Sequence, residues 1–439
     1  MASSSRKGWI VTLAGVGLNL ALGILYAWSI FSKQLTEPIA RGGFGWTRTQ
    51  ATLPYTIAIA CFAFMMVPAG RLQDKLGPRI IASVGAVLTG IGLVVASFST
   101  PSASWPAIVG FGLLAGTGFG LGYAAATPAA VKWFPPQKKG LITGLVVAGF
   151  GLAPVYIAPL SKWLLATYGV AFSFRVLGIA FLVVTLLLSQ LIVNPEKALN
   201  VAAPGSAAAK AAGADVAWQQ MIRTADFWLL WFQYAFGATA GLMIIGHLAK
   251  IVAAQSAGAI QTGFVFVALL AVFNAAGRIV AGVVSDRIGR TVTLVSVFLL
   301  QASNMIFFSG FTTFSGFVVG SAVVGFSYGA CLSLFPATAA DRWGTKNLGL
   351  NYGILFTAWG VGGVFGPILA GKIADATGSY QLAYQISAGL LMLATLLAMF
   401  SYVNVSVNVP EREITLTLGK KKKAEAEGGA PAAKTPEPA

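Results

Sequence analysis

Twelve apolar stretches follow one another along this chain of 439 residues, each close to the ~20 residues that an α-helix needs to cross a bilayer. In lipid every backbone polar group must be bonded within the structure, so such a chain can fold only as a bundle of membrane-spanning helices. We predict spans at residues 9–31, 51–70, 80–98, 105–131, 141–165, 170–193, 227–247, 262–284, 292–311, 314–340, 350–374 and 382–405.

The composition is that of an integral membrane protein. Hydrophobic residues make up 56% of the chain and charged residues 10%, and the 52 glycines favour helices that pack closely. Cys61 and Cys331 fall in apolar spans, where free thiols behave as small buried hydrophobic groups, so no disulfide is expected. We expect an all-α membrane protein of twelve helices that lies in the lipid bilayer as a monomer and holds no cofactor or metal.

The net charge of +16 is distributed unevenly along the chain. With the N-terminus in the cytoplasm, 21 of the 29 Lys and Arg residues fall in cytoplasmic segments and seven fall outside. This asymmetry follows the positive-inside rule, so we predict a multi-pass protein of the cell membrane with both termini cytoplasmic. Because the charge is explained by topology, no nucleic-acid partner is expected.

The spans divide into two sets of six. We predict an N-terminal half at residues 1–193, a cytoplasmic linker at 194–225 with one short surface helix near Trp218, and a C-terminal half at 226–410. Residues 411–439 are rich in Ala, Gly, Pro and Lys and cannot build a core, so a disordered cytoplasmic tail is expected there.

A loop motif occurs twice, at equivalent places in the two halves. It runs from Gly70 to Arg79 after the second span and from Gly282 to Arg290 after the eighth, and parallel repeats of this kind are typical of transporters. The aspartate of each copy can lie near a neighbouring helix N-terminus, whose dipole favours an anion, and a flanking cation can pair with it. We favour a gate that holds one side shut over an ordinary basic turn. The candidate gating residues are Asp74, Arg79, Gly282, Asp286, Arg287 and Arg290.

Arg278 brings a permanent charge into the apolar span at residues 262–284. A guanidinium in hydrocarbon costs at least about 2.5 kcal/mol, so it should face a cavity and meet an anion. It could instead reach cytoplasmic water, since the span ends at Val284, only six residues further along the chain. We favour the cavity, because helical side chains lean toward the N-terminus of their helix, here toward the membrane centre. Asn274, one turn earlier on the same face, is a second candidate ligand.

Nearly the whole chain resembles the major facilitator superfamily, which repeats a Gly-x-x-x-Asp-Arg-x-Gly-Arg loop between helices 2 and 3 and helices 8 and 9. The first copy here departs from that loop at Lys75 and Pro78. A narrower resemblance, over residues 23–29, 132–141, 274–286 and 334–353, is to the oxalate/formate antiporter family and the related monocarboxylate transporters. It implies transport of a small organic anion by alternating access.

The same resemblance implies roles for several side chains. Those families carry a functional arginine at the place of Arg278, and a guanidinium fork matches one carboxylate with two parallel hydrogen bonds. Tyr26 and Tyr123 match tyrosines that line the antiporter's cavity, and Tyr328 stands where the antiporter has another aromatic residue. Each of the three is equally well explained as a packed aromatic side chain.

Trp359 is the most informative departure, because it stands where the antiporter has the lysine that meets the second carboxylate of oxalate. One cation remains in the expected pocket. The sequence therefore predicts a small monocarboxylate substrate such as lactate, pyruvate or formate. An oxalate/formate-type exchanger is the alternative.

The proton carrier is left open. Many monocarboxylate transporters have an aspartate at the place of Asn274, and no Asp or Glu lies inside a predicted span here. A proton could travel on the substrate carboxylate or on His247, the single histidine, which is otherwise explained as an interfacial residue. A membrane enzyme would need a nucleophile, a metal cluster or an acid pair that these spans lack. A transport-like carboxylate sensor remains the alternative from another class.

Overall fold

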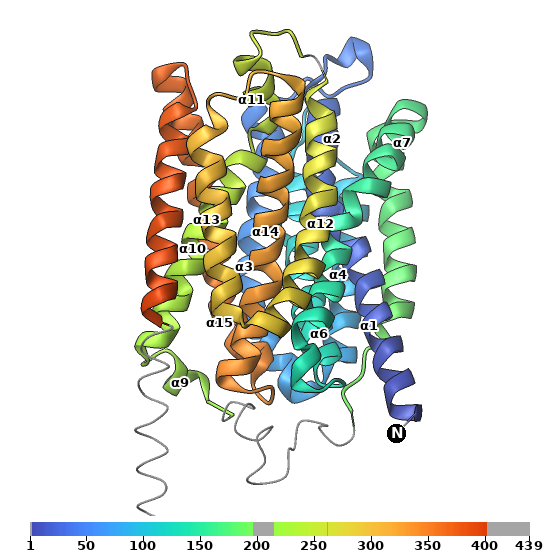
Figure 1. The fold of residues 1–439 in the computed structure, drawn as a ribbon. Coiled ribbons are helices and arrows are strands. Elements are labelled where there is room, and N and C mark those ends of the chain that lie inside the picture. The colour runs from blue at the N-terminus through green and yellow to red at the C-terminus, as the bar shows by residue number, and fades with distance from the viewer. Residues whose placement is uncertain (1, 196–214, 261, 402–439) are drawn as a thin grey trace, which may run out of the picture.

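The computed structural model describes residues 2–195, 215–260 and 262–401. Within these ranges, 11 helices are long and apolar enough to cross a membrane. The longest of them, α7 (Lys139–Ser189), consists of two crossings joined at Gly169, whose φ of 76° and ψ of −177° break the helical geometry. The described part of the chain is therefore a bundle of twelve crossing segments (Figure 1).

The first half contains six crossings, and two of them include irregular helical segments. Its elements are α1 (Ala2–Leu22), the 3-10 turn η1 (Gly23–Ala27), α2 (Trp28–Thr36), η2 (Ile39–Arg41), α3 (Arg48–Leu76), α4 (Pro78–Ala96), α5 (Trp105–Ala107), the π-helical segment η3 (Ile108–Ala115), α6 (Gly116–Val131), η4 (Pro136–Lys138) and α7. The segments α1, η1 and α2 together make the first crossing, and α5, η3 and α6 make the fourth.

The second half repeats this order with longer unbroken helices. Its elements are α9 (Trp218–Met221), α10 (Ala225–Ile245), α11 (Leu248–Gln255), α12 (Gly263–Ile288), α13 (Arg290–Phe308), α14 (Phe314–Trp343), α15 (Leu348–Thr377) and a final helix, Gln381–Ser401. The short helix expected near Trp218 is α9. The short helix α11, which follows the seventh crossing, has no counterpart in the spans predicted from the sequence.

The two halves meet closely at one end of the bundle. A Cβ atom on Gly70 of α3 would lie 2.0 Å from the carbonyl oxygen of Gly349 in α15, and one on Gly140 of α7 would lie 2.3 Å from that of Gly282 in α12. Only glycine allows backbones to approach in this way. The N-terminus and α9 lie at this end, which is the lower end in Figure 1 and which we call the duplicated-loop end.

Other sequence predictions can be placed on this frame. Cys61 and Cys331 are both free thiols, as expected. The expected tail at 411–439 lies outside the described residues, and so does most of the expected linker, residues 196–214.

Candidate transport site

Arg278 lies on α12, halfway into the bundle, with none of its surface exposed. Its Nε donates to Oδ1 of Asn274 at 2.8 Å, and its Nη1 donates to the backbone carbonyl of Val147 on α7, in the other half. Its Nη2 has no hydrogen-bond partner among the described residues. The guanidinium therefore does not reach water at the end of the helix. Three further cations within predicted spans have exposed side chains instead: Lys162, Arg175 and Lys372.

Two glycines of α7 bring the guanidinium against the opposite half. A Cβ atom on Gly144 would lie 2.2 Å from the carbonyl oxygen of Arg278, so α7 and α12 touch through their backbones at this level. A Cβ atom on Gly151 would lie 3.2 Å from Nε of Arg278 and 3.2 Å from Oδ1 of Asn274. Because Gly144 and Gly151 have no side chains, α7 leaves space next to the Arg278 guanidinium.

A small cavity in the middle of the bundle borders this guanidinium. Its walls are mostly aromatic, and they come from both halves. Tyr123 and Phe150 pack edge to face at 5.6 Å between ring centroids, and Phe356 stacks on Trp359 at 4.8 Å. The lining residues are Tyr26, Phe62, Tyr123, Phe150, Arg278, Leu332, Phe356 and Trp359. Arg278 is the one charged residue among them.

A chain of hydrogen bonds crosses the bundle next to this cavity. Nε1 of Trp359 donates to the hydroxyl oxygen of Tyr328 at 2.7 Å, and that hydroxyl lies 3.5 Å from the hydroxyl of Tyr26 in the other half. Tyr328 itself is packed against Gly241, where a Cβ atom would lie 2.6 Å from its ring. The structure therefore brings Arg278, Asn274, Tyr26, Tyr123 and Trp359 together, with Tyr328 immediately behind them.

His247 lies elsewhere, between α10 and α11. Its Nε2 is 2.9 Å from the carbonyl oxygen of Pro367 in α15, and its Nδ1 is 3.4 Å from the hydroxyl of Tyr380. A carbonyl can only accept, so Nε2 carries the proton and Nδ1 accepts from Tyr380. Burial lowers the pKa of His247 from its usual value near 6.5. A neutral, half-buried histidine that joins the end of α10 to α15 is not part of the central cavity.

At the duplicated-loop end, the first copy of the loop places Asp74 under the start of α15. One carboxylate oxygen of Asp74 accepts from the backbone N–H of Leu350 at 3.0 Å. The other oxygen accepts from Nε2 of Gln73 at 2.7 Å and lies 3.5 Å from Nζ of Lys132, at the end of α6. An aspartate of the first half thus meets the N-terminus of a helix in the second half.

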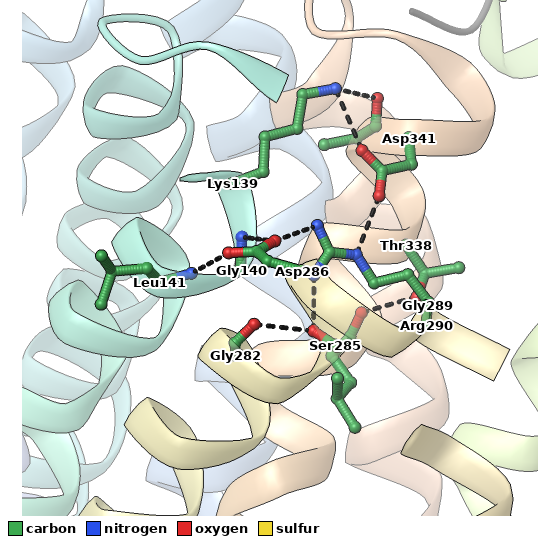
Figure 2. Close-up of polar contacts among 12 residues, drawn as sticks. Lys139, Gly140, Leu141, Gly282, Ser285, Asp286, Gly289, Arg290, Thr338 and Asp341 are labelled. Carbon is green, nitrogen blue, oxygen red and sulfur yellow. Dashed lines mark hydrogen bonds and ion pairs between the residues drawn. The ribbon is translucent and has the colours of Figure 1, made fainter. Parts of the chain in front are cut away.

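The second copy makes the reciprocal contact through two backbone N–H groups and a shorter ion pair. The two oxygens of Asp286 accept from the backbone N–H groups of Gly140 and Leu141, both at 2.9 Å, at the start of α7 (Figure 2). Arg290 pairs with Asp286 at 2.7 Å and with Asp341 at 2.8 Å. Both carboxylates therefore hold a helix N-terminus of the opposite half, where unpaired N–H groups and the helix dipole favour an anion.

The cations that serve these carboxylates differ in part from those expected. Arg79 and Arg287 are exposed, whereas Lys132 and Arg290 make the contacts to Asp74 and Asp286. Sequence reasoning also missed the ion pair of Lys139 with Asp341, whose Nζ and Oδ1 are 3.2 Å apart. A positional signal could have found it. Lys139 directly precedes Gly140-Leu141, and Asp341 directly precedes Arg342-Trp343, and these two short sequences are the ones that recur in the other half as Gly349-Leu350 and Lys132-Trp133.

Comparison with known proteins agrees with this architecture. The Major Facilitator Superfamily model matches residues 9–302 and 235–434. The oxalate:formate antiporter of Oxalobacter formigenes is 28% identical over 403 residues, covering 90% of this chain and 91% of that protein. Monocarboxylate transporter 13 of Rattus norvegicus is 24% identical over 92% of each chain. The crystal structure of the transporter FucP superposes with a TM-score of 0.66 at 15% identity, covering 89% of this chain and 99% of that one. The chain belongs to the Major Facilitator Superfamily, whose members are membrane transporters rather than enzymes.

Proposed function

We propose that this transporter carries small organic monocarboxylates of the lactate, pyruvate or formate class and that Arg278 binds their carboxylate. The observation that carries the proposal is the wholly buried guanidinium, which keeps Nη2 unpartnered among the described residues beside the aromatic cavity. A buried charge of this kind is costly unless it meets a counter-charge. A carboxylate is the anion that a guanidinium fork fits best.

The single cation supports a monoanion over a dianion. Trp359 and the other lining residues supply aromatic and aliphatic surface with the hydroxyls of Tyr26 and Tyr123, so a second carboxylate would lose its water without gaining a second cation. The named relatives, an oxalate:formate antiporter and a monocarboxylate transporter, support a small organic anion in general. An oxalate/formate-type exchange remains the second candidate, because the antiporter is similar over 90% of this chain.

The geometry also suggests how binding and conformation are coupled. The bond from Arg278 to the Val147 carbonyl ties the C-terminal half to the N-terminal half. A carboxylate that takes two guanidinium nitrogens competes with that carbonyl, so binding loosens a contact between the halves at the centre of the bundle. By the positive-inside asymmetry we place the duplicated-loop end in the cytoplasm. We propose that Asp74 and Asp286, which accept from backbone N–H groups of the opposite half, hold this end shut.

For proton coupling we propose that the proton travels with the substrate. His247 bonds to Pro367 and Tyr380 and is absent from the residues that line the cavity. Desolvation raises the pKa of a carboxyl group and pairing with the Arg278 guanidinium lowers it, so the substrate would take up its proton as it leaves the guanidinium. A pH gradient should therefore drive uptake in His247→Gln nearly as well as in the wild type. Loss of gradient-driven uptake in that variant would assign the proton to the histidine.

Uptake of labelled lactate, pyruvate and formate into proteoliposomes tests the main proposal. Arg278→Gln should abolish uptake, and Arg278→Lys should be poor because the planar fork is lost. Arg175→Gln is the matched control, since Arg175 is an exposed arginine on the sixth crossing. Binding without uptake in the wild type would indicate a sensor. Wild-type rates in Arg278→Gln would remove Arg278 from the site, and equal competition by oxalate would favour the exchanger.

A further inference from the structure

A second small cavity lies within the C-terminal half, separate from the central one. It is enclosed by α10, α13, α14 and the final helix, and it has room for one water-sized molecule. Two polar side chains face it, Gln301 from α13 and Ser327 from α14. The ring of Tyr328 forms part of its wall, while the hydroxyl of Tyr328 bonds to Trp359 in the central cavity.

The polar atoms in this cavity are unpaired. Gln301 is 3% exposed and Ser327 is 1% exposed. The Nε2 and Oε1 atoms of Gln301 and the Oγ of Ser327 find no hydrogen-bond partner within the described part of the chain. A buried polar group without a partner costs about 1–3 kcal/mol, and native structures rarely leave three such atoms on residues that line one cavity. The rest of the wall offers only apolar groups and the weakly polar thiol of Cys331.

We propose that Gln301 and Ser327 bind one water molecule in this cavity. The amide supplies a donor and an acceptor and the hydroxyl supplies either, so a single water can make three hydrogen bonds, the usual number for a buried water. The water joins α13 to α14 behind Tyr328. It is a built-in part of the C-terminal half and does not depend on which substrate is carried.

Two glycines of α10 leave the space that the water occupies. A Cβ atom on Gly237 would lie 3.0 Å from the ring of Phe298 and 3.4 Å from the sulfur of Cys331, so alanine there fits with a small shift and fills part of the cavity. Gly241 does not offer this route, because a Cβ atom there would lie 2.6 Å from Tyr328. Gly237→Ala therefore removes the room for water and leaves both polar side chains in place.

Thermal unfolding of the wild type, Gln301→Leu, Ser327→Ala and the double variant tests the proposal. A bound water and a dry cavity predict changes in Tm of opposite sign. If the water bridges the pair, Gln301→Leu and Ser327→Ala should each lower Tm by about 2–4 °C. The double variant should lose less than the sum, because either change alone already releases the water. If the cavity is dry, each substitution removes an unsatisfied polar group, so Tm should rise in both and the effects should add. That result would overturn the proposal.

Hydroxyl-radical labelling by a brief X-ray pulse tests the water directly, since the radicals form from water in place. Cys331 borders the cavity, whereas Cys61 lies on α3 in the other half and serves as the internal control. In the wild type, oxidation of Cys331 should be fast for a buried residue. It should fall at least several-fold in Gly237→Ala and in Gln301→Leu, with Cys61 unchanged. Equal labelling of Cys331 in all three proteins would contradict a bound water.

Discussion

The two copies of the loop have the same backbone and different ion pairs. Gly77 and Gly289 adopt nearly identical left-handed conformations, with φ of 90° and 93°, and each copy places an aspartate at a helix N-terminus of the other half. Around Asp286 the charges continue from Arg290 to Asp341 and on to Lys139. Around Asp74 the cation is Lys132, at a longer distance of 3.5 Å.

The ion pairs around Asp286 and Asp74 differ because the residues at three equivalent positions differ. When the repeats are aligned on Gly77 with Gly289, Trp133 with Trp343 and Gly140 with Gly349, the charged set of the second copy meets uncharged residues in the first. Pro78, Val131 and Leu348 stand where the second copy has Arg290, Asp341 and Lys139. The helix contact is thus common to both interfaces, while the linked series of short ion pairs is present at only one, and the other has the single 3.5 Å pair of Lys132 with Asp74. We infer that the α7–α12 interface holds more firmly than the α3–α15 interface.

The largest expected effect comes from deleting the two aspartates separately. Asp286→Ala removes the acceptor for two backbone N–H groups at 2.9 Å and a 2.7 Å ion pair with Arg290. Asp74→Ala removes one N–H bond at 3.0 Å, a weaker contact to the N–H of Gly349 and a 3.5 Å ion pair. Hydrogen bonds to a charged group are worth about 1.5–3 kcal/mol each, and 1.4 kcal/mol is tenfold. We expect Asp286→Ala to reduce the closed population at least about tenfold, and Asp74→Ala by less.

Crosslinking of cysteines placed at the duplicated-loop ends of α3 and α15, on a background without native cysteines, measures that population. Uptake should slow with little change in substrate affinity, because the aspartates shift an equilibrium and do not touch the cavity. Arg287→Ala is the control, since Arg287 is exposed in the same loop. A larger loss in Asp74→Ala than in Asp286→Ala would reverse the ranking of the two interfaces.

A smaller effect is expected within the extended network. Lys139 is 2% exposed and also donates to the carbonyl of Ala340 at 3.1 Å, so Asp341→Val would leave a buried ammonium with too few partners. Lys139→Leu leaves Asp341 30% exposed and still paired with Arg290, so it should cost less. The double variant, with both Lys139→Leu and Asp341→Val, has the uncharged residue types of the equivalent positions Leu348 and Val131. It should recover part of the Tm that Asp341→Val alone loses. Failure to recover would mean that the two side chains do not act as a pair.

Pro78→Arg tests the same comparison by strengthening the weaker interface. It gives the first copy of the loop the cation that Arg290 supplies in the second. Pro78 is the buried first residue of α4, and the new guanidinium would lie four residues from Asp74, as Arg290, itself largely buried, does from Asp286. A partly exposed ion pair is worth up to about 1 kcal/mol, so crosslinking should rise by up to about fivefold. Lys132→Ala should then matter less than it does in the wild type. An unchanged effect of Lys132→Ala would show that the arginine does not reach Asp74.

Much of the fold could be predicted from the sequence because its signals are local. Apolar stretches of sufficient length gave the twelve crossings, and the repeated loop indicated two similar halves. Arg278 stood out because a charge within an apolar stretch is conspicuous without any knowledge of packing. Its proposed role in substrate binding remains a prediction.

Contacts that depend on packing could not be predicted in this way. Lys139 and Asp341 are far apart in the chain and each sits at a helix end, where charged residues are ordinary. Gln301 and Ser327 are common residues on two helices, and only the packed bundle shows that they face one cavity. The helix α11 has only 8 residues, too few to be identified as a membrane-spanning segment.

The smallest expected effect lies at the other end of α15, where His247 bonds to Pro367. Burial is the largest influence on the charge of His247 and lowers its pKa, while the Pro367 carbonyl favours the charge, Lys250 disfavours it and Asp375 favours it. The unfolded chain then binds a proton more readily than the folded one. Stability is therefore complete above pH 6.5 and declines as the pH falls through 6.5 toward the lowered pKa of the folded protein.

His247→Gln tests this directly, because a glutamine amide can still donate to the Pro367 carbonyl and does not titrate. Between pH 7.5 and pH 5.5 the wild type should lose a few degrees more of Tm than the variant, measured in the same detergent. The difference should persist in Asp74→Ala, since the two contacts hold opposite ends of α15 and are expected to add. If Asp74→Ala abolished the difference, the two ends of α15 would be coupled, and the α3–α15 interface would have to be treated as one unit.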